Sequence, residues 1–179
     1  GGAGPEHVNW VRSKLNQLLR IKPATAARFK NQLPCMQPSS TDQTRASKLQ
    51  TRDYFMTPKA DGQRYFVYFC QMQRVPLIVA VDRQYRLTLL DGDVPPQLFN
   101  GTILDCELMS PDLVLVFDAL QIQGTNLRNK TYLFRQQQVE KLLRRTQLVL
   151  NGANARMKEA WPYDHFALSK LESVPYPCD

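Results

Sequence analysis

The sequence predicts an α+β protein with a mainly antiparallel sheet and flanking helices. Strand-like segments are clustered between residues 65 and 120, and helical periodicity is found before and after them. Short polar turns separate neighbouring strand-like segments, as in antiparallel hairpins. The 179 residues are enough to build one sizeable core.

Amphipathic helices are expected at both ends of the strand cluster. Apolar residues between Val8 and Leu19 recur at helical spacing, and Pro23 ends this segment. A second helix is expected over Tyr132–Leu150, with apolar residues on one face and two arginines near its end, where cations suit the helix dipole.

Five segments have the composition or alternation of strands. They are Tyr65–Cys70, Leu77–Asp82, Tyr85–Leu90, Thr102–Met109 and Leu113–Leu120. The second and third flank a polar dipeptide, and the fourth and fifth flank a Ser-Pro-Asp turn, so each pair is expected to form a hairpin. Residues 1–7 read as a flexible lead-in or expression scar, and 8–179 as one domain.

The composition excludes several classes of protein. Hydrophobic content of 43% and charged content of 22% fit a globular protein. No apolar run approaches the roughly 20 residues of a membrane span, and no signal peptide is visible. Cys70 and Cys106 lie in strand-like segments without paired metal-ligand spacing, so we expect buried thiols, no structural zinc and an intracellular location, in nucleus or cytoplasm. A viral protein would be found in a viral factory or virion.

Charge is unevenly distributed along the chain. Residues 1–59 and 128–158 each carry +7, whereas 60–127 carry −4 and 159–179 carry −3. Basic segments attract phosphates or nucleic acid, although each could equally be a solvated helix face. An acidic centre between basic flanks suits a metal-assisted nucleotide site.

The segment from Lys59 to Arg64 carries the most chemical information. A lysine at a strand edge can be a nucleophile if its amine is neutral. Gly62 lets the backbone approach a ligand closely, and the Arg64 guanidinium can bind phosphate or sugar oxygens. Taken alone, this pattern is also that of an ordinary turn into a strand.

Further segments in the same order give the chain a recognisable resemblance. Lys59-Ala-Asp61-Gly62 resembles motif I of the covalent nucleotidyltransferases, which comprise mRNA capping guanylyltransferases and ATP-dependent polynucleotide ligases. Four other segments resemble capping-enzyme elements. They are Leu33–Ser39, Asp82-Arg83, Ile103–Leu108 (motif III) and Leu115–Leu120 (motif IIIa), and Arg135 matches the arginine that opens the next helix.

The resemblance implies formation of a lysyl-N–GMP intermediate from GTP and transfer of GMP to RNA with a 5′-diphosphate end, assisted by Mg²⁺ or Mn²⁺. Roles follow by match. Lys59 would be the nucleophile and Asp61 would fix the motif I turn. Arg64 and Glu107 would contact the ribose, with Glu107 also near the metal. Phe117 would stack on the purine, and Arg83 would lie in the nucleotide pocket. Roles unrelated to a nucleotide stay open for two of these residues: Phe117 could be a core residue, and Glu107 could face solvent.

The family also has motif IV, an Asp-Gly on a strand, and motif V, a Lys-x-Lys, and neither is found after Gly124. Arg156-Met157-Lys158 is the nearest approach to motif V, and its context does not support the match. Residues 8–179 are therefore expected to form a partial nucleotidyltransferase domain without an OB-fold domain. Further capping-enzyme domains or a partner chain would complete the site, and activity of these residues alone is left open.

Three alternatives to a capping guanylyltransferase remain. One is an ATP-dependent ligase-type adenylyltransferase. Another is a non-catalytic module that binds guanine nucleotide, a cap or RNA. The last is a structural domain that shares only the fold.

Overall fold

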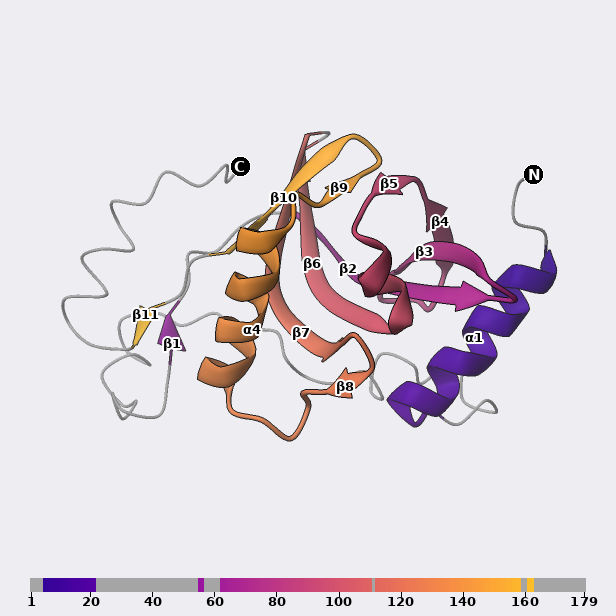
Figure 1. Ribbon diagram of the computed structural model, residues 1–179, viewed down its shortest axis with the longest axis horizontal. Coiled ribbons are helices and arrows are strands. Elements are labelled where there is room, and N and C mark those ends of the chain that lie inside the picture. The colour runs from indigo at the N-terminus through magenta and orange to yellow at the C-terminus, as the bar shows by residue number, and fades with distance from the viewer. Residues whose placement is uncertain (1–4, 22–54, 57–61, 111, 159–160, 163–179) are drawn as a thin grey trace.

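A computed structural model describes residues 5–21, 55–56, 62–110, 112–158 and 161–162 (Figure 1). The elements in chain order are α1 (Pro5–Leu19), β1 (Phe55–Met56), β2 (Gln63–Met72), β3 (Val75–Val81), β4 (Leu87–Leu90), β5 (Gly92–Asp93), the 3-10 helix η3 (Pro96–Asn100), β6 (Thr102–Ser110), β7 (Leu113–Ile122), β8 (Thr125–Asn126), α4 (Tyr132–Arg145), β9 (Val149–Leu150), β10 (Ala153–Met157) and β11 (Trp161–Pro162).

One nine-stranded sheet organises the part of the chain that the structure describes, and the α+β prediction is confirmed. Its order is β4-β3-β2-β6-β7-β10-β9-β5, with β8 paired to β7. The β7–β10 pair is parallel and the other pairs in this sheet are antiparallel. A separate antiparallel pair joins β1 and β11.

The sheet curls so that its two ends meet. Strands β4 and β5 stand at opposite ends of the strand order, yet only Asp91 separates them in the chain. The backbone N–H of Asp91 donates to the Asn151 side chain at 2.7 Å, and the backbone N–H of Asn151 donates to the Asp91 carbonyl at 2.7 Å. These contacts close the gap between β4 and the β9–β10 turn, so the sheet partly encloses its own core.

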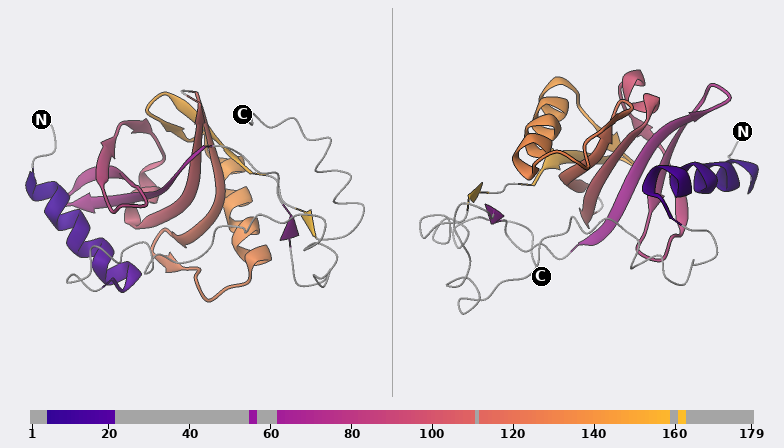
Figure 2. Two further views of the ribbon diagram at one scale, coloured as in Figure 1. Left: turned by 180° about the vertical axis from the view of Figure 1, so that it is seen from behind. Right: turned by 90° about the horizontal axis from the view of Figure 1, so that it is seen from below.

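The two helices cover opposite faces of this sheet (Figure 2). Helix α4 buries Val139 and Leu142 against one face, where β-strand residues such as Val67 and Val116 gather. Helix α1 buries Val11 and Leu15 against residues from the other face. Strand alternation sends successive side chains to the two cores. No helix in the described ranges is long and apolar enough to span a bilayer.

The N-terminal helix is also anchored by polar contacts to the turn between β3 and β4. The Tyr85 hydroxyl donates to Asn16 Oδ1 at 2.6 Å, and Arg12 donates to the Tyr85 carbonyl at 2.8 Å. Tyr85 has a φ of 62°, which is unusual for a residue with a side chain. These contacts join α1 to the same turn that carries Arg83.

The predicted helix between Val8 and Leu19 and both predicted hairpins are confirmed, but other details of the prediction are wrong. Helix α1 already begins at Pro5, so residues 5–7 are helical and do not belong to a flexible lead-in. Helix α4 ends at Arg145, because Thr146 has extended dihedrals and its hydroxyl donates to the Leu142 carbonyl at 2.7 Å. A third hairpin joins β2 to β3 through Gln73 and Arg74, both with positive φ. Such turns usually contain asparagine or glycine, so the sequence carried no signal for this one.

Candidate active site

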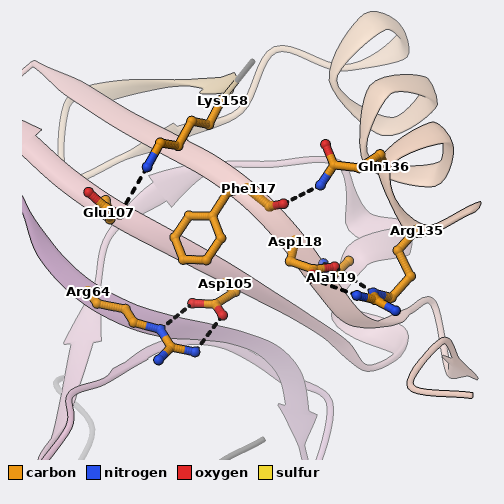
Figure 3. A network of polar contacts seen from close by, with 9 residues as sticks. All are labelled: Arg64, Asp105, Glu107, Phe117, Asp118, Ala119, Arg135, Gln136 and Lys158. Carbon is orange, nitrogen blue, oxygen red and sulfur yellow. Dashed lines mark hydrogen bonds and ion pairs between the residues drawn. The ribbon is translucent and has the colours of Figure 1, made fainter. Parts of the chain in front are cut away.

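A group of polar residues occupies the face of the sheet that α1 covers, beyond the end of the α1 core. Side chains two positions apart on a strand point to the same face of the sheet. Arg64 therefore lies on the same face as Phe66, and Asp105 on the same face as Ile103, and both Phe66 and Ile103 belong to the α1 core. Glu107 continues the same alternation on β6. Figure 3 shows the Phe117 ring between the Arg64–Asp105 pair and a second pair, Glu107 with Lys158.

Arg64 and Asp105 form a bidentate ion pair between β2 and β6. Arg64 Nε and Nη2 donate to the two Asp105 oxygens at 2.9 and 2.7 Å. The Asp105 side chain is fully buried and that of Arg64 is 9% exposed. Burial raises the pKa of Asp105 to about 6, and the negative charges of Asp118 and Glu107 also raise it. The hydrogen bonds and the positive charge of Arg64 lower this pKa but do not outweigh the burial. The Arg64 Cζ atom also lies over the Phe66 ring, 5.1 Å from its centre, as in a cation–π contact.

Glu107 is buried, which removes the solvent-facing interpretation of this residue. It is 5% exposed, and Oε1 accepts a bond from Lys158 Nζ at 3.3 Å. Its other oxygen, Oε2, is buried without a hydrogen-bond partner. Lys158 is itself 4% exposed and lies 5.6 Å from the centre of the Phe117 ring. A buried carboxylate with one free oxygen is therefore held beside an aromatic ring.

Phe117 lies at a β-bulge on β7. Asp118 is opposite Asp105 and Val116 is opposite Cys106, so β6 has no partner for Phe117. The residue is 4% exposed but belongs to neither large hydrophobic cluster of the sheet. The Gln136 side-chain amide of α4 donates to the Phe117 carbonyl. The bulge thus places an aromatic ring among charged residues, outside the two apolar cores.

The start of α4 is attached to the next residue of the bulge. Arg135 Nε and Nη2 donate to Asp118 at 2.8 and 3.2 Å, and Arg135 Nη1 donates to the Lys130 carbonyl at 2.7 Å. Asp118 is fully buried and also accepts from the Ala119 backbone N–H at 2.8 Å. The predicted position of Arg135 at the opening of this helix is confirmed, and its contact is a carboxylate of motif IIIa.

The structure explains Gly62 differently from the sequence. A Cβ atom at this position would lie 2.7 Å from the Leu108 carbonyl oxygen and 2.7 Å from Met109 Sδ. Glycine is therefore required where the chain enters β2 beside the end of β6, whether or not a ligand is close. Close approach of a ligand to Gly62 stays a prediction from the sequence.

Arg83 lies at the same end of the sheet as Arg64. Val81, the last residue of β3, pairs with Phe66 near the start of β2, so the turn that follows β3 lies at the end of the sheet where β2 begins. Asp82 shapes the turn by accepting from Gln84 and Arg86 backbone N–H groups at 2.8 and 2.9 Å. Burial works to raise the pKa of Asp82, but these bonds and the Arg86 side chain outweigh it and lower the pKa.

Two predicted site residues, Lys59 and Asp61, lie outside the described residues, and so does Leu33–Ser39. Of the predicted residues that the structure describes, Arg64, Glu107 and Phe117 are brought together, and Arg83 lies at the same end of the sheet. Lys158 is a site residue that the sequence does not predict. It stands in Arg156-Met157-Lys158, the nearest approach to motif V, and only the parallel β7–β10 pairing places it beside Phe117.

The described residues hold no group of three or more histidine, cysteine or acidic side chains that could bind a metal by themselves. Glu107 Oε2 is the candidate ligand, because it is an unpaired carboxylate oxygen in a polar site. One carboxylate is compatible with Mg²⁺, which commonly takes its other ligands from water and substrate phosphates.

Comparison with known protein families identifies the chain. The family model described as mRNA capping enzyme, catalytic domain, matches residues 3–163, which is most of the sequence. The match extends through every strand and helix above, from α1 to β11. The chain therefore belongs to the mRNA capping enzyme catalytic domain family, whose activity is that of a GTP:RNA guanylyltransferase.

Proposed function

We propose that Lys59 is the nucleophile of this guanylyltransferase and that the charged cluster around Phe117 binds the nucleotide. Neutral Lys59 Nζ would attack the α-phosphorus of GTP, forming an N–P bond while the bond to the bridging oxygen of pyrophosphate breaks. The ammonium proton is lost to solvent or base. The terminal phosphate oxygen of a 5′-diphosphate RNA would then attack the same phosphorus and release the lysine.

The observation that carries this proposal is the convergence of Arg64, Glu107 and Phe117 on one face of three adjacent strands. These residues are far apart in sequence, and the resemblance to capping enzymes implies a nucleotide-binding role for each of them. An aromatic ring binds a purine by stacking, and the flanking guanidinium and carboxylate can bond the ribose hydroxyls. Stacking on Phe117 requires one face of its ring to open, since the residue is 4% exposed.

Arg64 would reach the ribose from its position on Asp105, which fixes the guanidinium fork on both oxygens. Arg83 would bind phosphate from the turn at the same end of the sheet. Asp61 and Gly62 would shape the loop between Lys59 and β2. Lys158 would neutralise Glu107 and offer a donor at the edge of a base stacked on Phe117.

Glu107 would hold Mg²⁺ or Mn²⁺ through Oε2 together with nucleotide phosphates. The ion offsets triphosphate charge and assists departure of pyrophosphate. We further propose residues 8–179 as one partial nucleotidyltransferase domain, with additional capping-enzyme domains or a partner chain supplying the elements of motifs IV and V.

The test is covalent labelling with α-³²P-GTP or α-³²P-ATP and Mg²⁺ or Mn²⁺, followed by denaturing electrophoresis. The expected result is a GTP-dependent adduct that is stable to base, labile to acid, and absent in Lys59→Ala. Lys141→Ala is the matched control because Lys141 is exposed on α4. An adduct that survives Lys59→Ala would contradict the assigned nucleophile. An ATP-specific adduct would contradict guanine selectivity, and a folded protein that forms no adduct would contradict activity of these residues alone.

A further inference from the structure

We propose that Gln136 of α4 is a positioning residue for nucleotidyl transfer, because its side-chain amide holds the bulge that aims the Phe117 ring. The inference rests on the proposed function, in which Phe117 stacks on the base. Gln136 itself contacts no reacting atom and would act through the backbone of Phe117.

The bulge leaves Phe117 without the usual restraints of a strand residue. The β6 register passes from Val116 to Asp118, so Phe117 has no cross-strand partner there. Pairing with β10 reaches Val116 as well, through Met157 and a 2.8 Å bond from the Lys158 N–H to the Val116 carbonyl. The residues on both sides of Phe117 therefore have register partners in the sheet, whereas Phe117 has none. A contact from outside the sheet is thus in a position to set the orientation of this residue.

Helix α4 supplies those contacts to two consecutive residues. Gln136 Nε2 donates to the Phe117 carbonyl, and Arg135 holds Asp118 through two hydrogen bonds. Thr131 caps the helix, accepting from the Phe134 N–H at 3.2 Å, so the first turn is a fixed base for both side chains. Rotation of the bulge would break the Gln136 bond and turn the ring away from the space between Arg64 and Lys158.

Packing alone does not explain a glutamine at this position. Gln136 is 6% exposed, lies beside the apolar residue Val139 on the inner face of α4, and has a buried Oε1 without a partner. An unpaired buried oxygen is unfavourable, and an aliphatic side chain of similar length would avoid that cost. The feature that such a side chain lacks is the donor to Phe117.

The first test measures the hydrogen bond independently of activity. Phe117-Asp118 is the one place in the sequence where aspartate follows phenylalanine. Labelling with ¹³C-carbonyl phenylalanine and ¹⁵N-aspartate therefore gives one carbonyl–amide correlation in the NMR spectrum, which reports the Phe117 carbonyl. In Gln136→Met, the Phe117 carbonyl resonance should shift in the direction of a lost hydrogen bond. Gln137→Met, at the exposed neighbouring position, should leave it unchanged. An unshifted resonance in Gln136→Met would overturn the proposal.

The second test asks whether the bond acts through base recognition. Gln136→Met is expected to raise the KM of adduct formation with GTP roughly tenfold, with a smaller change in kcat, because a misplaced ring weakens binding of the base. Ribose 5′-triphosphate, which lacks the base, should react equally with both proteins. The Gln136→Met effect should also disappear in a Phe117→Leu background.

The outcomes separate the two proposals. Equal loss with GTP and with the base-free triphosphate, or an effect that persists in Phe117→Leu, would mean that Gln136 only stabilises the fold. An adduct that survives Lys59→Ala would overturn the proposed nucleophile, and the NMR test would then decide the role of Gln136. A folded, unchanged protein that forms no adduct would contradict activity of these residues alone, and the NMR test would again decide the role of Gln136. If Gln136→Met does not fold, a scalar coupling across the hydrogen bond between Gln136 Nε2 and the Phe117 carbonyl carbon can be sought in the unchanged protein. Its absence would count against the proposal.

Discussion

Arg64 and Asp105 share two hydrogen bonds of 2.9 and 2.7 Å across the boundary between β2 and β6. Arg64 is a predicted nucleotide-binding residue, and the Asp105 carboxylate holds its guanidinium in place. Asp105 itself is assigned no contact with the nucleotide. Asp105 is thus a support for Arg64, and its protonation governs how firmly the guanidinium is held.

Asp105→Asn is expected to change how stability depends on pH. The pKa of Asp105 is about 6 in the folded protein, compared with an ordinary value of 3.8, so the folded state binds an extra proton between these values. The stabilisation from this group is complete below about pH 4 and is lost as pH rises through 6. Urea unfolding from pH 4 to 7 should show the free energy of the unchanged protein falling relative to Asp105→Asn. A constant difference between the two proteins would contradict the raised pKa.

Lys158→Met is expected to lower the free energy of unfolding by about 3 kcal/mol, because it leaves the Glu107 carboxylate buried without its cation. Glu107→Gln in the same protein should recover part of this loss, with a coupling energy of roughly 1–3 kcal/mol. Chemical denaturation of the two single variants and the double variant measures the cycle. Strict additivity would mean that the 3.3 Å contact contributes nothing to stability.

Gly62→Ala is expected to destabilise the fold by about 1–3 kcal/mol, since its Cβ would lie 2.7 Å from the Leu108 carbonyl oxygen. It should also reduce GTP adduct formation, because β2 carries Arg64. Gln63→Ala, at the exposed next position, is the control and should change stability by less than about 0.5 kcal/mol. Equal thermal midpoints for the two variants would show that the β2–β6 approach tolerates a side chain.

Tyr85→Phe is expected to cost about 1 kcal/mol of stability, because its buried hydroxyl donates to Asn16 Oδ1 at 2.6 Å. Tyr65→Phe is the matched control, since its hydroxyl bonds the exposed Gln63 at 2.9 Å. Amide hydrogen exchange in α1 should become faster in Tyr85→Phe and stay unchanged in Tyr65→Phe. Unchanged exchange in both would indicate that apolar packing alone holds the helix.

Much of the fold could be predicted because its signals are local. The spacing between Val8 and Leu19 indicates a helix wherever the chain goes, and α1 is found there. The β2–β3 hairpin could not be predicted, since Gln73 and Arg74 adopt left-handed conformations that their sequence does not favour. The helix predicted up to Leu150 is longer than α4, which ends at Arg145, because no glycine or proline marks this end and Thr146 instead bonds the Leu142 carbonyl through its hydroxyl.

By itself, the sequence determined the order of chemical groups: Lys59, Arg64, Glu107 and Phe117 occur in motifs whose residue types and spacing are independent of long-range contacts. The tertiary structure decided which charges meet. Lys158 reaches Glu107 only through the parallel β7–β10 pairing, and Gln136 reaches Phe117 only because α4 packs beside the bulge. The physical reason is that ion pairs and carbonyl contacts depend on strand register and helix docking, which are set by the burial of two whole cores and not by any local pattern.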